Sequence, residues 1–156
     1  PMVLGPGELA AEALRREASS RLAWLPDGGH RLEQPLDSGD LRHAVQAAAR
    51  DLEPGDRVLE LAGPEALPHR ELVARAAAVL GRRAPRILPL PASLVRSAAR
   101  LLERALADPP LTEAMLEVLQ RDDRIDPRAA CKELGLELTP LDETLRRSFA
   151  ARAERT

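Results

Sequence analysis

The 156-residue chain is almost without aromatic side chains: it contains Trp24, Phe149 and no Tyr. No tyrosine can therefore act as a catalytic proton donor, and there are no aromatic platforms for stacking on nucleic-acid bases. The formal net charge of −2 provides no attraction to a phosphate backbone either. We expect no nucleic-acid partner, and a core built by closely packed Ala, Leu and Val side chains.

Cysteine is also scarce, because Cys131 stands alone. A lone cysteine excludes a disulfide framework or a cysteine-rich metal site, and it suits a reducing compartment. No apolar run approaches the ~18 residues that a membrane span needs, and no signal peptide opens the sequence. We therefore expect a soluble, cytoplasmic protein.

The motifs of a self-sufficient enzyme are missing as well. No glycine-rich phosphate loop follows a strand, since Gly5-Pro6-Gly7 is too short and contains proline, and no Gly-x-Ser-x-Gly elbow is present. Asp40 and His43 lie one helical turn apart, but two side chains without a third do not make a metal site. We expect no catalytic residue and no metal in this chain, with His30 and His69 at the surface.

Hydrophobic periodicity predicts an α+β domain, rich in helices, that covers residues 1–156 as one unit. Caps and breakers set the ends of its elements, notably Asp40, Gly81, Asp126 and Thr139. We expect strands at 2–4, 31–36, 57–62 and 87–90, and helices at 8–18, 41–52, 68–80, 92–107, from Thr112, after Asp126-Pro127 and after Thr139-Pro140.

Two groups of arginines permit a functional and a structural interpretation. Arg82, Arg83 and Arg86 follow Gly81, where they would hold an oxyanion of a substrate or form a solvated loop.

The second group is Arg96, Arg100 and Arg104, which are spaced by four residues and form one stripe of a helix. This stripe would dock on an anionic membrane or a protein complex, or it would be the solvated face of a helix packed on the core.

A series of short motifs follows one another along the chain. In order they are Pro1–Glu8, Gly28-Gly29, Gln34–Leu41, Leu61–Glu65, Arg70–Leu72, Leu80–Arg82, Ile87–Pro91, Pro109–Thr112, Asp126-Pro127 and Leu134-Gly135. Together these motifs resemble the C-terminal portion of extended and atypical short-chain dehydrogenase/reductases, the NAD(P)-dependent epimerase/dehydratase family. They are most similar to the branch of the accessory NAD(P)-binding subunit of respiratory complex I.

This resemblance implies the substrate-side part of a Rossmann-type protein whose nucleotide-binding half lies upstream. NAD or NADP would bind to the longer parent, and none would bind to this chain alone. Pro1, Met2 and Val3 would lie near the nicotinamide end of the cofactor. Gly5, Gly7, Arg31 and Gln34 would face a small-molecule substrate, together with Arg82 and Arg86 if these hold an oxyanion.

Two alternatives stay open at this point. One is a non-catalytic cofactor-binding scaffold that docks on a membrane or complex through the arginine helix. The other is a helical interaction module that is unrelated to reductases. The sequence also allows a homodimer formed through the edge of the first strand, because an unpaired strand edge offers free backbone groups to another chain.

Overall fold

The computed structural model describes residues 2–51, 58–91, 93–95, 97, 100–101 and 124–150. Pro1, Arg96, Arg104, Thr112 and the Asp122-Asp123 pair lie outside the described residues. In chain order the elements are β1 (Val3–Leu4), α1 (Leu9–Ser19), β2 (Leu22–Pro26), the short 3-10 turn η1 (Asp27–Gly29), β3 (Leu32–Glu33), β4 (Leu36–Asp37), α2 (Ser38–Asp51), β5 (Leu67–Pro68), α3 (His69–Val79), β6 (Arg86–Leu90), α6 (Arg128–Leu134) and α7 (Leu141–Ala150).

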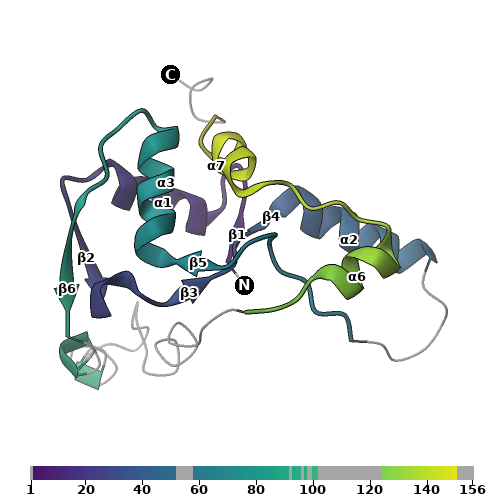
Figure 1. The fold of residues 1–156 in the computed structure, drawn as a ribbon, viewed down its shortest axis with the longest axis horizontal. Coiled ribbons are helices and arrows are strands. Elements are labelled where there is room, and N and C mark those ends of the chain that lie inside the picture. The colour runs from purple at the N-terminus through teal and green to yellow at the C-terminus, as the bar shows by residue number, and fades with distance from the viewer. Residues whose placement is uncertain are drawn as a thin grey trace.

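The described strands form three separate pairs. β1 pairs with β4 in parallel, β2 pairs with β6 in parallel, and β3 pairs with β5 in the antiparallel sense. Figure 1 shows the β2–β6 pair at one side of the molecule, α2 and α6 at the other, and β1 between them. The prediction of a helix-rich chain with a few short strands is confirmed.

The core lies where α1, α3 and α7 surround β1 (Figure 1). Each helix presents apolar residues at spacings of three and four to this core, so one face of each is buried. Small alanines on α1 and α3 let the two helices approach closely. The buried residues are Leu4, Ala11, Leu14, Ala18, Leu67, Leu72, Val73, Ala76, Ala77, Leu141 and Leu145.

The end of α3 confirms the role predicted for Gly81. This glycine has a positive φ of 67°, which side chains with a Cβ rarely adopt. Its amide donates to the carbonyl of Ala78, and the amide of Arg82 donates to the carbonyl of Ala77. These two bonds are the Schellman arrangement that ends a helix.

The start of α2 corrects the prediction for Asp40. The helix begins at Ser38, and the side chain that caps it is that of Asp37, whose Oδ1 accepts the amide of Gly39 at 2.7 Å. Asp40 is buried in the first turn, where its carboxylate accepts the amide and the hydroxyl of Thr139 at 2.7 and 2.9 Å. Asp40 and Thr139, which the sequence predicts as helix caps, instead bond to each other and join α2 to the segment before α7.

Two strand predictions are also corrected. The stretch 31–36 is not one strand, because Pro35 has no amide to continue a ladder; it divides into β3 and β4, which pair with different partners. The stretch 57–62 was predicted as a strand, but its described residues 58–62 are not in one. Val58 is 92% exposed, and no described strand lies alongside to supply a ladder.

Of the predicted helix 92–107, residues 93–95, 97, 100 and 101 are described and are helical. The segment Leu22–Leu25, which the sequence marks only as apolar, lies in strand β2. Within the described ranges, no helix has both the length and the apolar content that crossing a bilayer requires.

The core predicts a difference between two helix leucines. Leu72 on α3 has 0% of its surface exposed, whereas Leu9 on α1 has 83%. Leu72→Ala should lower the free energy of unfolding by about 2–5 kcal/mol, because it leaves a cavity among packed side chains. Leu9→Ala should change it by less than about 0.5 kcal/mol. Urea unfolding followed by far-ultraviolet circular dichroism measures both, and equal losses would contradict this core.

Candidate functional site

A cleft of about 500 Å³ lies at the carboxyl ends of the parallel strands β1 and β4. In open sheets with parallel strands, ligands bind beyond the carboxyl ends of the strands. The turn after β1, the first turn of α2 and the end of α7 form its walls. The lining residues are Pro6, Asp37, Ser38, Gly39, Asp40, Arg42, His43, Arg147 and Ala150.

Met2 and Val3, the described residues expected near a cofactor, lie in or beside β1 and are not part of the lining of the cleft. The side chain of Met2 is half-buried and packs against the core, and its carbonyl accepts the amide of Leu36 at 2.8 Å. Val3 is half-buried in β1, in register with Leu36. These two residues therefore shape strand β1, and the cleft lies beyond the carboxyl end of that strand.

The Gly5-Pro6-Gly7 turn approaches α2 closely. Gly5 is buried, and a Cβ at this position would collide with the side chain of Ser38. Gly7 is exposed, has a φ of 84°, and has open space where a Cβ would lie. Gly5 is therefore required by close packing at the cleft, whereas Gly7 is required only by the turn conformation.

The lining of the cleft carries two carboxylates and two guanidinium groups. The carboxylates accept hydrogen bonds from within the chain, Asp37 from Gly39 and Asp40 from Thr139. Arg147 forms an ion pair with Glu143 at 3.0 Å, so the exposed Arg42 and His43 are the lining side chains best placed to meet an anionic group. Guanidinium groups bind carboxylate and phosphate well, because their N–H groups match the spacing of the oxygens.

β3 and the residues on each side of it precede β4 in the chain and lie outside the lining of this cleft. Arg31 precedes β3 and forms an ion pair with Asp27 at 3.6 Å, with 34% of its side chain exposed. Gln34 follows β3 and is buried. Both residues predicted to face a substrate thus lie on one short segment that leads directly into β4.

The buried amide of Gln34 bonds to the backbone on two other segments. Its Nε2 donates to the carbonyls of Gly63 and Ile125, both at 2.8 Å, and its Oε1 accepts the amide of Ile125 at 2.9 Å. The side chain reproduces the paired bonds of a strand ladder. The polar side-chain atoms of Gln34 are therefore engaged in hydrogen bonds with the backbone of its own chain.

A second hollow of about 720 Å³ lies beyond Gln34, between β3 and the approach to α6. Leu32, Gln34, Ile125, Asp126 and Arg128 are among its lining residues. Hydrogen bonds from Arg128 lower the pKa of Asp126 to about 2, so its carboxylate stays ionised. This hollow contains a matched ion pair and no excess of charge at that pair.

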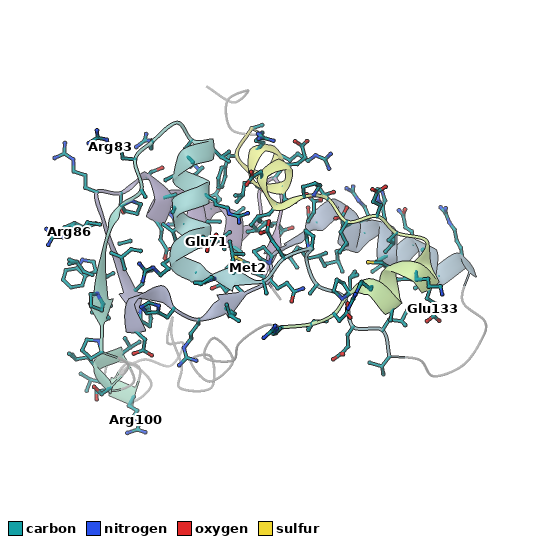
Figure 2. All side chains as sticks on the ribbon, in the orientation of Figure 1. Met2, Glu71, Arg83, Arg86, Arg100 and Glu133 are labelled. Carbon is teal, nitrogen blue, oxygen red and sulfur yellow. The ribbon has the colours of Figure 1, made fainter. Side chains whose placement is uncertain are left out.

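Arg82 and Arg86 do not join Arg31. They follow the C-terminal end of α3, whose N-terminal end contacts Arg31, and an 11-residue helix spans about 16 Å. Figure 2 shows Arg83 and Arg86 at the margin of the molecule and Met2 near its middle. One Nη of Arg82 donates to the carbonyl of Ser19 at 3.2 Å, which attaches this loop to α1.

His69 is the functional candidate that sequence reasoning missed. It was expected at the surface, but its side chain is only 17% exposed and lies between two carboxylates. Its Nε2 lies 3.0 Å from Oε2 of Glu17, and its Nδ1 lies 2.7 Å from Oε1 of Glu33. Burial alone would lower its pKa, but the hydrogen bonds and charges of Glu17 and Glu33 outweigh this and raise the pKa to about 10. His69 is therefore a cation at neutral pH.

No family model matches the chain, and neither does any curated protein. Solved structures do match. MoeE5 in complex with UDP-glucuronic acid and NAD has a TM-score of 0.68 and 19% identity over 99% of this chain and 46% of that chain. Human epimerase family protein SDR39U1 with NADPH gives 0.67 and 21% over 97% and 46%. The dTDP-glucose 4,6-dehydratase of Bacillus anthracis in complex with NAD gives 0.65 and 13% over 97% and 42%.

This chain has the fold of one portion of these proteins. It spans less than half the length of each. The expected likeness to epimerase, dehydratase and reductase structures is therefore confirmed at the level of the fold.

The remaining cleft residues had only weak signals in the sequence. Asp37 and Ser38 lie within the Gln34–Leu41 motif, yet nothing in the sequence places Arg147 of α7 beside them. The cluster of Glu17, Glu33 and His69 joins residues that are up to 52 positions apart, and no local spacing predicts it. Only the packing of α1 against α3 brings these side chains together.

The amide of Gln34 generates a stability prediction. Gln34→Leu keeps most of the volume but leaves the carbonyl of Gly63 and both backbone groups of Ile125 without their partner. We expect a loss of about 2–4 kcal/mol in the free energy of unfolding, because buried polar groups without a partner are costly. Gln46→Leu, at an exposed position of α2, is the matched control and should cost little. Thermal unfolding of both variants would measure this, and equal melting temperatures would contradict the role of Gln34.

The raised pKa of His69 predicts a pH dependence of stability. A group with a higher pKa in the folded state stabilises fully below its unfolded pKa, here 6.5, and this stabilisation is lost as the pH rises through about 10. Between these values the free energy of unfolding should fall by up to about 1.4 kcal/mol per pH unit. His69→Gln should remove this slope, and His43→Gln should retain it. Urea titrations from pH 6 to pH 10 would show whether it exists.

Proposed function

We propose that this chain is the C-terminal, substrate-side domain of a cytoplasmic NAD(P)-dependent epimerase/dehydratase- or reductase-like protein. The observation that carries the proposal is the coverage: nearly the whole chain matches less than half of several proteins that were solved with NAD or NADPH. The unmatched remainder of such a protein would hold the dinucleotide.

The β1–β4 pair supports this proposal. Parallel strands occur almost only in larger sheets that are covered on both faces, and two strands of two residues are too short to be stable alone. β4 pairs with one edge of β1, and no other described strand pairs with the opposite edge. A strand from an upstream nucleotide-binding half would continue the sheet at that edge.

The cleft then has a role in substrate binding. Val3 and Met2, with Pro1 before them, would lie at the nicotinamide end of the cofactor, and the Gly5–Gly7 turn would close that end. Arg31 and the Gln34 segment would form the substrate wall. The exposed Arg42 would attract an anionic group of the substrate.

The chemistry of such a protein would depend on both halves. The cofactor supplies hydride transfer when it is bound. The residues of this chain would hold and orient the substrate in the cleft.

Calorimetric titration of NAD(H) and NADP(H) tests this function. The ligands are titrated into this chain and into the longer protein that contains it, side by side. We expect binding to the longer protein alone, because the cofactor requires a glycine-rich strand–turn–helix that this chain lacks. Binding by neither protein, or an upstream sequence without such a loop, would overturn the proposal.

A matched pair of variants in the longer protein tests the cleft itself. Gly5→Ala places a Cβ against Ser38 and should displace the first turn of α2, whereas Gly81→Ala has open space and lies at the far end of α3. We expect Gly5→Ala to weaken cofactor binding by about tenfold or more, since misplacement by an ångström is costly at such sites. Equal affinities of both variants would place the cofactor away from the Gly5–Gly7 turn.

A further inference from the structure

The first turn of α3 is attached to the substrate wall by both its backbone and its side chains. The amide of His69 donates to the carbonyl of Arg31 at 2.9 Å. The imidazole of the same residue lies against Glu33, two positions further along the wall. Arg70, the next residue, places Nη1 3.3 Å from Nε2 of His30. Three consecutive contacts thus bind this helix turn to residues 30–33.

The imidazole of His69 also joins three elements. Glu17 comes from α1, Glu33 from β3 and His69 from α3, and the two carboxylates face opposite ring nitrogens. Only the protonated ring has an N–H at both nitrogens. A neutral ring would turn a lone pair toward one carboxylate. Nε2 is hydrogen-bonded to Glu17, whereas Nδ1 lies 2.7 Å from Glu33 at ion-pair distance without hydrogen-bond geometry, so the two carboxylates favour a cationic ring by their charge.

β3 depends on this contact more than a longer strand would. It consists of Leu32 and Glu33 and pairs with only two residues of β5. The Oε2 of Glu33 is buried without a hydrogen-bond partner among the described residues. Without the charge of His69, the carboxylate of Glu33 would be buried next to Glu17 with no ion pair, which is strongly unfavourable. Glu33 would then turn toward water and move β3 with it.

We propose that His69 is a positioning residue that fixes β3 between α1 and α3 and thereby sets where Arg31 and Gln34 stand in the substrate wall. This inference rests on the proposed function, because it assigns Arg31 and Gln34 to that wall. His69 itself acts through Glu33 and touches no part of the cleft lining.

The effect of losing His69 is local. α1 and α3 are also joined by the core residues Ala11, Leu14, Leu72 and Val73, none of which contacts the ion cluster by its polar atoms. His69→Gln should leave this apolar contact in place while it releases β3. A general loss of structure would instead affect the core helices and β3 alike.

Amide hydrogen exchange on this chain tests the local effect without any ligand. His69→Gln should speed the exchange of the Glu33 amide, which faces β5, by about tenfold or more relative to the amides of Ala76 and Ala77 in the core part of α3. His43→Gln is the control and should change neither set. Unchanged exchange in β3, or an equal increase in all amides, would overturn the positioning role.

The protonation state has its own spectroscopic signature. Nitrogen-15 spectra of the histidine rings at pH 8 should show both nitrogens of His69 protonated. His69→Arg supplies a cation with several N–H groups and should recover part of the slow exchange that His69→Gln loses. A neutral His69 ring at pH 8, or equal exchange in the Arg and Gln variants, would contradict the positioning role of His69.

Ligand binding by the longer protein tests whether His69 affects the substrate wall. UDP-glucose is the probe, and we expect His69→Gln to raise its Kd by about tenfold or more while the Kd of the cofactor stays within about twofold. Equal losses for both ligands would overturn the specific link to the wall. If the unmodified longer protein binds cofactor but not UDP-glucose, then UDP-glucose is not its substrate, and the exchange experiment still decides the role of His69. If it binds neither, the proposed function fails independently.

Discussion

The side-chain amide of Gln34 joins three stretches of backbone that no strand ladder connects. It bonds to Gly63 and to both backbone groups of Ile125, and it lies at the step where β3 ends and β4 begins. Pro35 follows and has no amide to offer, so the chain changes here from antiparallel to parallel pairing. This one buried amide therefore holds the segment around Gly63 and the approach to α6 against the end of β3.

Similar side-chain links replace regular sheet structure elsewhere in the chain. Asp40 holds the segment before α7 through Thr139, and His69 holds β3 through Glu33. Four of the six described strands have two residues each, so each ladder provides few hydrogen bonds. Buried polar contacts of this kind are specific in geometry but are costly when one partner is lost. The cleft is therefore bordered by elements that single substitutions can displace without unfolding the apolar core.

Much of the fold could be predicted because helices carry their pattern locally. Leu72, Val73 and Ala76 repeat at the helical period, and Gly81 ends α3 where the sequence places it. The segment at 57–62 misled for a physical reason: its β-forming residues meet no described neighbouring strand, and Val58 is left exposed. Asp40 has the sequence of a cap, but Asp37, three positions earlier, directly precedes the helix start at Ser38. The partner of Asp40 is 99 residues away, and no local rule could find it.

The cleft depends on relations that neither composition nor spacing contains. Pro6, Ser38 and Arg147 come from three distant parts of the chain and meet only because β1 and β4 are parallel and α7 packs beside them. Two parallel strands of two residues provide few hydrogen bonds, so the position of this pair depends on the helices α1 and α7 that pack on it. The turn after β1 and the first turn of α2 begin at the carboxyl ends of the pair. The apolar core therefore places the walls of the cleft to a greater extent than the strand ladder does.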